Sequence, residues 1–156
     1  GIQIATGVFI AAMLRVAFTV FCYWALLVAF GVFSISQSWD VVPITMFAAG
    51  AFAAVILGIT AKVTKEDFFM TILGRLIIMP MFLFSGTFFP LESMPQYLQP
   101  IGWISPLWHA TELGRHFSYG YSIPGSLIFI HFAYLTLLLV SGLSLANRAF
   151  TARLAK

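Results

Sequence analysis

Long apolar stretches recur along the chain, and their length is their most informative property. A helix needs about 20 mostly apolar residues to cross a hydrocarbon core of roughly 30 Å, because each residue adds only about 1.5 Å. Four stretches reach that length, over about residues 16–34, 41–61, 68–89 and 126–146. The pattern therefore predicts an all-α membrane protein with four transmembrane helices and with both ends of the chain on one side.

The composition agrees with a membrane as the solvent. Only 8% of the residues are charged and 61% are hydrophobic, whereas a soluble domain carries about 25% charged residues. A soluble domain and a disordered tail are both excluded on these numbers. The net charge of +3 comes from scattered bases, which give no electrostatic footprint for nucleic acid. We therefore expect membrane lipid, and no nucleic acid, around this chain.

Basic residues predict the orientation of the spans. Lys and Arg collect on the cytoplasmic side of membrane proteins, and six of the eight bases flank one face of the predicted bundle. The other face has Arg115 alone. We therefore expect a multi-pass protein of the plasma (inner) membrane, with both ends of the segment cytoplasmic and residues 34–40 and 90–125 outside. The six bases are Arg15, Lys62, Lys65, Arg148, Arg153 and Lys156.

The apolar character begins at the first residue. Residues 1–14 would make the first span too long, so we expect them to form a helix on the inner surface that turns into the membrane near Arg15. No cleavable signal is evident at the start. We interpret the chain as the inner part of a longer membrane protein.

The predicted outer segment, residues 90–125, carries two helix-start signals. Ser93 and Ser105 are N-cap residues followed closely by Pro95 and Pro106, which favours helices over about 94–103 and 106–117. Both helices are too short to span and too apolar to lie wholly in water. They are either half-inserted, re-entrant helices that close the outer end of a pore, or a small aromatic cap on the bundle.

The second outer helix offers the only arrangement that suggests a metal. His109, Glu112 and His116 fall on one helical face at positions i, i+3 and i+7. The spacing matches neither the zinc-protease motifs nor the paired motif of di-iron bundles. We expect no metal here, and a hydrogen-bonded helix in which Glu112 bridges to Arg115 or His116. A metal-dependent membrane enzyme remains an alternative.

Two ionisable residues fall inside the predicted spans. Arg75 lies about 10 Å from the inner end of its helix by the helical rise. Its guanidinium either snorkels to the inner interface or contacts the anionic headgroup of a substrate. His131 is expected to be a hydrogen-bond partner between helices.

The end of the third span is rich in phenylalanine and interrupted by proline. Pro80 removes a helix hydrogen bond and predicts a kink, and Gly86 permits close approach of another group. Phe84, Phe88 and Phe89 follow. These rings either line a pathway for a lipid-like or aromatic substrate, together with Arg75, or face lipid and pack between helices.

The region from Leu83 to Arg115 resembles a known family. The run LFSGTFFPLESMP at 83–95, followed by PLWHATELGR at 106–115, strongly resembles the signature of the ABC-2 family of transporter permeases. Within that family it is similar to the daunorubicin-resistance and nodulation-factor export types. The resemblance covers about a fifth of the chain. It marks an outer gate, or re-entrant motif, formed by Gly86, Pro90, Pro95, Pro106, Glu112 and Arg115.

The resemblance implies a fold and a mechanism. The chain would be helices three to six of a six-helix permease that works as a homo- or heterodimer. Each protomer would bind a separate nucleotide-binding subunit holding ATP and Mg, since this sequence has no Walker A motif and needs no cofactor of its own. The complex would be an ATP-driven exporter of an amphiphilic compound: a drug, a glycolipid or a lipid-linked saccharide.

The same resemblance suggests how this transport subunit meets the ATPase. The inner loop with Lys62, Lys65 and Glu66 would be a minor contact to the ATPase, or else a solvated turn. The competing function is an ion-coupled transporter or channel. That function needs acidic residues inside spans, and none of the five acids lies in one.

Overall fold

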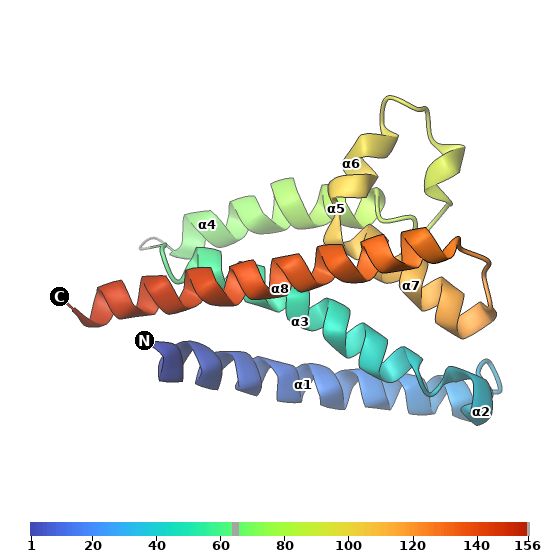
Figure 1. Ribbon diagram of the computed structural model, residues 1–156, viewed down its shortest axis with the longest axis horizontal. Coiled ribbons are helices and arrows are strands. Elements are labelled where there is room, and N and C mark those ends of the chain that lie inside the picture. The colour runs from blue at the N-terminus through green and yellow to red at the C-terminus, as the bar shows by residue number, and fades with distance from the viewer. Residues whose placement is uncertain (64–65, 156) are drawn as a thin grey trace.

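The computed structural model describes residues 1–63 and 66–155, and every regular element in that part of the chain is a helix (Figure 1). The long helices are α1 (Ile2–Ala29), α3 (Val41–Thr60) and α8 (Gly125–Leu154), and the short α2 (Ile35–Ser38) joins the first two. A broken helix follows α3, made of α4 (Glu66–Ile72), the π-helix η1 (Leu73–Ile78) and α5 (Met79–Leu83). The remaining elements are the 3₁₀ turn η2 (Leu91–Ser93), α6 (Gln99–Ile104) and α7 (Pro106–Tyr119).

Three helical stretches of the described chain are long and apolar enough to cross a membrane. They are Ile2–Ala29, Ile35–Thr60, which joins α2 to α3, and Gly125–Leu154. The N- and C-terminal ends lie at the same end of the bundle (Figure 1), where Arg153 donates a hydrogen bond of 2.8 Å to the carbonyl of Val63. The prediction of an all-helical membrane protein is confirmed.

The helix predicted at 68–89 is shorter than expected. Its apolar part, Phe68–Leu83, ends where the hydroxyl of Ser85 bonds the Phe82 carbonyl at 2.7 Å and Gly86 adopts a φ of 78°. A positive φ stops an α-helix, and glycine adopts it without the steric cost that a Cβ brings. The fourth crossing therefore stays a prediction.

The turn predicted near Arg15 is wrong. Helix α1 continues unbroken from Ile2 to Ala29, because residues 1–29 contain no proline and its backbone hydrogen bonds need no interruption. Arg15 consequently lies halfway along α1 and does not mark its inner end. Helix α8 also extends past the predicted boundary at 146, to Leu154.

Helices α3 and α8 make the closest contact in the bundle. A Cβ added to Gly142 would lie 2.4 Å from the carbonyl carbon of Ala54, and one added to Gly58 would lie 2.8 Å from the Gly142 oxygen. Ala54 and Ala146 are fully buried beside these glycines. Small residues spaced by four let two membrane helices pack backbone to backbone.

Helix α7 is inserted into this bundle rather than placed on top of it. Leu113 of α7 forms a buried cluster with Ala48 and Ala51 of α3 and Leu135 of α8. Helices α6 and α7 are joined at Ser105, and we call residues 99–119 the hairpin, with Ser105 at its apex. The hairpin enters the bundle at the end opposite the chain termini (Figure 1).

The two hairpin helices differ in how well their limits follow the sequence. Helix α7 begins at Pro106 as predicted and ends at Tyr119, where Gly120 adopts a left-handed φ of 65°. Helix α6 was predicted to begin at Met94, but Met94 is extended, with ψ 153°, and the helix begins at Gln99. The proline in the first turn of α6 is Pro100, not Pro95.

We predict that Gly142→Ala destabilises the full-length protein, because its added methyl group overlaps the main chain of Ala54. The cost of such overpacking is about 1–3 kcal/mol, and a lower melting temperature in detergent measures it. Gly114→Ala is the matched control, since a Cβ there meets nothing within 4 Å. Equal melting temperatures for the two variants would contradict the close α3–α8 contact.

Candidate functional site

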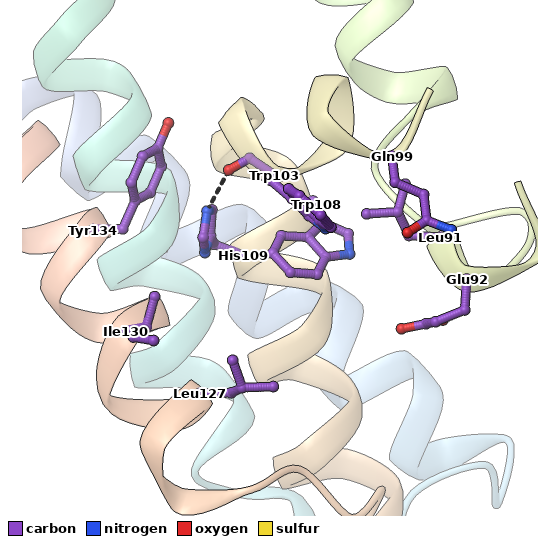
Figure 2. Close-up of a pocket in the computed structure, with 9 residues that line it drawn as sticks. All are labelled: Leu91, Glu92, Gln99, Trp103, Trp108, His109, Leu127, Ile130 and Tyr134. Carbon is purple, nitrogen blue, oxygen red and sulfur yellow. Dashed lines mark hydrogen bonds between the residues drawn. The ribbon is translucent and has the colours of Figure 1, made fainter. Parts of the chain in front are cut away.

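The apex of the hairpin leaves two main-chain carbonyls without helical partners. Trp103 and Ile104 end α6, and the carbonyls of a last helical turn have no intrahelical donor. The Nε2–H of His109 donates to the Trp103 carbonyl at 2.9 Å, as Figure 2 shows. The hydroxyl of Tyr134, from α8, donates to the Ile104 carbonyl. Side chains from α7 and α8 therefore satisfy the end of α6.

A second hydrogen bond ties the apex to α8. The Nδ1 atoms of His109 and His131 are 2.7 Å apart. Because the Nε2 of His109 carries the proton that Trp103 accepts, its Nδ1 accepts a hydrogen bond from the Nδ1–H of His131. Both rings are buried, and burial lowers the pKa of His109, against the opposing hydrogen bond to the Trp103 carbonyl. His131 is the interhelical hydrogen-bond partner that the sequence predicted.

Aromatic rings enclose the histidine pair. The ring of Tyr134 stacks on His109 with centroids 4.0 Å apart. The indole of Trp108 packs its edge against His109 at 4.9 Å and against His131 at 5.1 Å. These contacts exclude water from the pair and fix α7 against α8.

A second group of contacts joins the turn after α5 to α7. The Arg115 guanidinium donates to the carbonyl of Gly86, 29 positions earlier, and lies 3.4 Å from the carboxylate of Glu112. The predicted Glu112–Arg115 bridge is confirmed. The run Ser85-Gly86-Thr87 forms a turn that presents the Gly86 carbonyl, with the Ser85 hydroxyl also 2.5 Å from that of Thr87.

The carboxyl group of Glu112 is buried, and this changes its pKa. Its pKa is raised by burial, and the charge of Glu92 raises it further, while Arg115 opposes both effects. Glu112 is 6% exposed, so removing Arg115 would leave a buried carboxyl group without its ionic partner. The bridge thus holds Arg115 in the position from which it reaches Gly86.

A pocket of about 500 Å³ lies beside the hairpin apex (Figure 2). The residues that line this pocket come from η2, α6, α7 and α8 and are adjacent only in the folded chain, so the sequence did not predict the pocket. The indole N–H of Trp108 is buried without a hydrogen-bond partner among the described residues. The lining residues are Leu91, Glu92, Gln99, Trp103, Trp108, His109, Leu127, Ile130 and Tyr134.

A separate pocket of about 580 Å³ brings together three of the four predicted pathway residues. Arg75, Phe84 and Phe88 line it, with Met79, Pro80, Phe82 and Leu83. The fourth, Phe89, is 39% exposed and is not among the lining residues.

Arg75 projects from a π-helical turn. The N–H of Met79 bonds the carbonyl of Gly74, five residues earlier, so the helix is widened there. Pro80 explains the widening, since its ring displaces the carbonyl of the preceding turn. Single π-turns occur often at functional sites. The sequence predicted a kink at Pro80, and the structure has a π-helix just before it, at Leu73–Ile78. A single proline in a sequence does not predict this type of helix.

The other predicted residues lie apart from these two pockets. Pro90 precedes η2 and Pro106 begins α7, while Pro95 is exposed in the loop between η2 and α6. Lys62 is exposed just after α3. Lys65 lies outside the described residues, as does the side chain of Glu66.

The three residues weighed as a metal site have separate partners. His109 faces His131, Glu112 faces Arg115, and the Nδ1–H of His116 donates to the Tyr121 carbonyl at 2.7 Å. Among the described side chains, those of residues 1–63 and 68–155, no group of three His, Cys, Asp or Glu is placed to hold a metal ion.

Comparisons with known proteins agree with this architecture. Residues 2–119 match the family described as ABC-2 type transporter. The chain is 31% identical over 108 residues to "Nodulation protein J" of Neorhizobium galegae, covering 67% of this chain and 40% of that relative. No solved structure matches the chain.

We predict that Tyr134→Phe destabilises the full-length protein by about 0.5–1.5 kcal/mol, the net contribution of one intramolecular hydrogen bond. The ring and its stacking on His109 are retained, so the loss reports the hydroxyl bond to Ile104. Thermal unfolding in detergent measures it. Tyr97→Phe, at a side chain 78% exposed, is the control, and equal stability of the two variants would contradict this role for Tyr134.

Proposed function

The chain belongs to the ABC-2 type transporter family, and from this premise we propose that it is the membrane-spanning part of an ABC export permease. The observation that carries the proposal is the family match over residues 2–119, which includes α1, α3, the broken helix and the whole hairpin. The separate 108-residue match to the nodulation relative covers 40% of that relative's length. Export, its energy source and its cargo are therefore proposed for a longer protein.

The first part of the proposal concerns how the chain sits in the membrane. We infer that the hairpin is re-entrant and enters from the outer face, with its apex near mid-membrane. Tyr134, which holds the apex, lies nine residues after Gly125, or roughly 14 Å along α8. The broken helix α4–η1–α5 would provide the fourth crossing. We place the protein in the plasma membrane. Lys62, Arg148 and Arg153 would then lie on its cytoplasmic side.

The second part concerns energy. None of the five acids of the sequence lies within α1, α3 or α8, so these helices hold no carboxylate for ion coupling. We propose that the energy comes from a nucleotide-binding partner that holds ATP and Mg, and that two permease protomers assemble with two such subunits. Lys62, exposed after α3, would contact this partner together with Lys65 and Glu66.

The third part concerns the cargo. Arg75 is exposed and lines an apolar pocket with Phe84 and Phe88. A guanidinium beside aromatic rings suits an amphiphile with an anionic headgroup, since charge-assisted hydrogen bonds hold the head and apolar contact holds the tail. Drugs, glycolipids and lipid-linked saccharides include such compounds.

The mechanism follows from these three parts. ATP binding to the partner subunits would shift the permease between inward-open and outward-open packings. The cargo would enter from the inner leaflet, contact Arg75 and leave past Phe88 and the hairpin. Phe89 would act on the exit side, outside the pocket itself. This chain would supply the pathway and no covalent chemistry.

The association with an ATPase tests the proposal. We predict that the tagged full-length protein, extracted in mild detergent from its own cells, co-purifies with a nucleotide-binding subunit and that the complex hydrolyses ATP. Liposomes carrying the complex should lose transport when the Walker A lysine of the partner is replaced. Transport that continues without ATP, or full-length protein that never associates with an ATPase, would contradict the proposal and favour an ion-coupled transporter or channel.

The role of Arg75 has its own test. We predict that the full-length protein binds a fluorescent anionic phospholipid more tightly than its zwitterionic analogue, and that Arg75→Gln removes the preference, a loss of about tenfold. Phe88→Ala should weaken the binding of both probes. Phe129→Ala is the control, because Phe129 is 74% exposed on α8 and lines neither pocket. An unchanged preference in Arg75→Gln would show that Arg75 does not contact the headgroup.

A further inference from the structure

Arg15 lies at the middle of the bundle, where the sequence had not predicted it. The Sδ of Met13 is 3.1 Å from the position of a Cβ on Gly50, and Gly50 is near the midpoint of α3. Arg15 is two residues further along α1, or about 3 Å by the helical rise. Both ends of α3 are then roughly 10 Å or more away, so Arg15 lies deeper than a Lys or Arg near a helix end, whose charge reaches the interface by snorkelling.

Arg15 has no ionic partner within the part of the chain that the structure describes. Its side chain is exposed. In the most apolar 18-residue window of α1, only 6% of the residues are buried. The helices α1, α3 and α8 of a second copy could not supply the counter-charge, because they contain no Asp or Glu. Glu112 of α7 is already paired with Arg115. A charge at this depth is costly unless it is paired, and is then a marker of function or assembly.

The face of α1 around Arg15 has the features of a helix-packing surface. Gly7, Ala11, Arg15 and Thr19 follow one another at intervals of four and are all exposed. A Cβ added to Gly7 would meet nothing within 4 Å, so nothing in the described chain occupies the space there. Small residues at this spacing allow another membrane helix to approach closely. Arg75 differs, because it lines a pocket with aromatic rings.

We propose that this face packs against a further membrane helix of the same polypeptide, outside these 156 residues, which carries an Asp or Glu opposite Arg15. The length of the nodulation relative supports the choice of the same polypeptide, since the matched part is 40% of it. An apolar helix with one carboxylate at mid-depth would cover the exposed stripe and neutralise the guanidinium. The proposal holds whether or not the protein is driven by ATP.

The sign of one substitution separates a paired Arg15 from one that faces lipid. In the full-length protein, Arg15→Leu should lower the melting temperature by at least about 6 °C, because the partner carboxylate is left buried and unpaired. Arg15→Lys should retain most of the stability. Arg148→Leu, at an exposed arginine near the end of α8, should change it little. An unchanged or higher melting temperature in Arg15→Leu would overturn the proposal.

Cross-linking identifies the occupant independently of stability. A photoreactive phenylalanine at Phe18, which is 72% exposed on α1, should form a cross-link within one polypeptide that maps to a helix with an Asp or Glu. The matched probe at Phe129, 74% exposed on α8, should not reach that helix. Products from Phe18 that contain only lipid, a second copy or another subunit would overturn the proposal.

Discussion

The carbonyls at the end of a helix need hydrogen-bond donors from outside that helix, and this constraint shapes the hairpin end of the protein. The α6–α7 hairpin ends one short helix beside Tyr134, nine residues into α8, so the carbonyls of Trp103 and Ile104 need donors from side chains. His109 and Tyr134 are those donors. Their aromatic rings also shield the bonds, which lets a polar turn persist among apolar helices.

The rest of the structure provides the position for this turn. Gly58 and Gly142 let α3 and α8 pack backbone to backbone, and Leu113 of α7 then finds its place between Ala51 and Leu135. At the other side, Arg115 crosses from α7 to the Gly86 carbonyl. The hairpin is therefore bound to α8 through histidine and tyrosine, and to the turn after α5 through arginine.

Apolar length predicted α3 closely, because α3 is uninterrupted and bounded by polar residues, and Ser105-Pro106 predicted the start of α7. Local signals failed where two of them competed. Pro95 and Pro100 both suit a first helical turn, and the packing of Leu91 and Met94 in the core selects the second. Arg115 contacts Gly86, and Tyr134 contacts Ile104, across about 30 positions of the sequence. The hydrophobic periodicity of single helices cannot predict such contacts.

The depth of the hairpin apex tests the account most directly. A nitroxide label can be placed at Ile104, which is 72% exposed, in full-length protein whose cysteines, including Cys22, are replaced. Power saturation with oxygen and a polar nickel complex then reports depth in a bilayer. We expect a label at 104 to lie at a depth between those of labels at Ile130 and Leu137 of α8, because Tyr134 lies between these two residues. A label as shallow as one at Ser126, at the N-terminal end of α8, would contradict this depth.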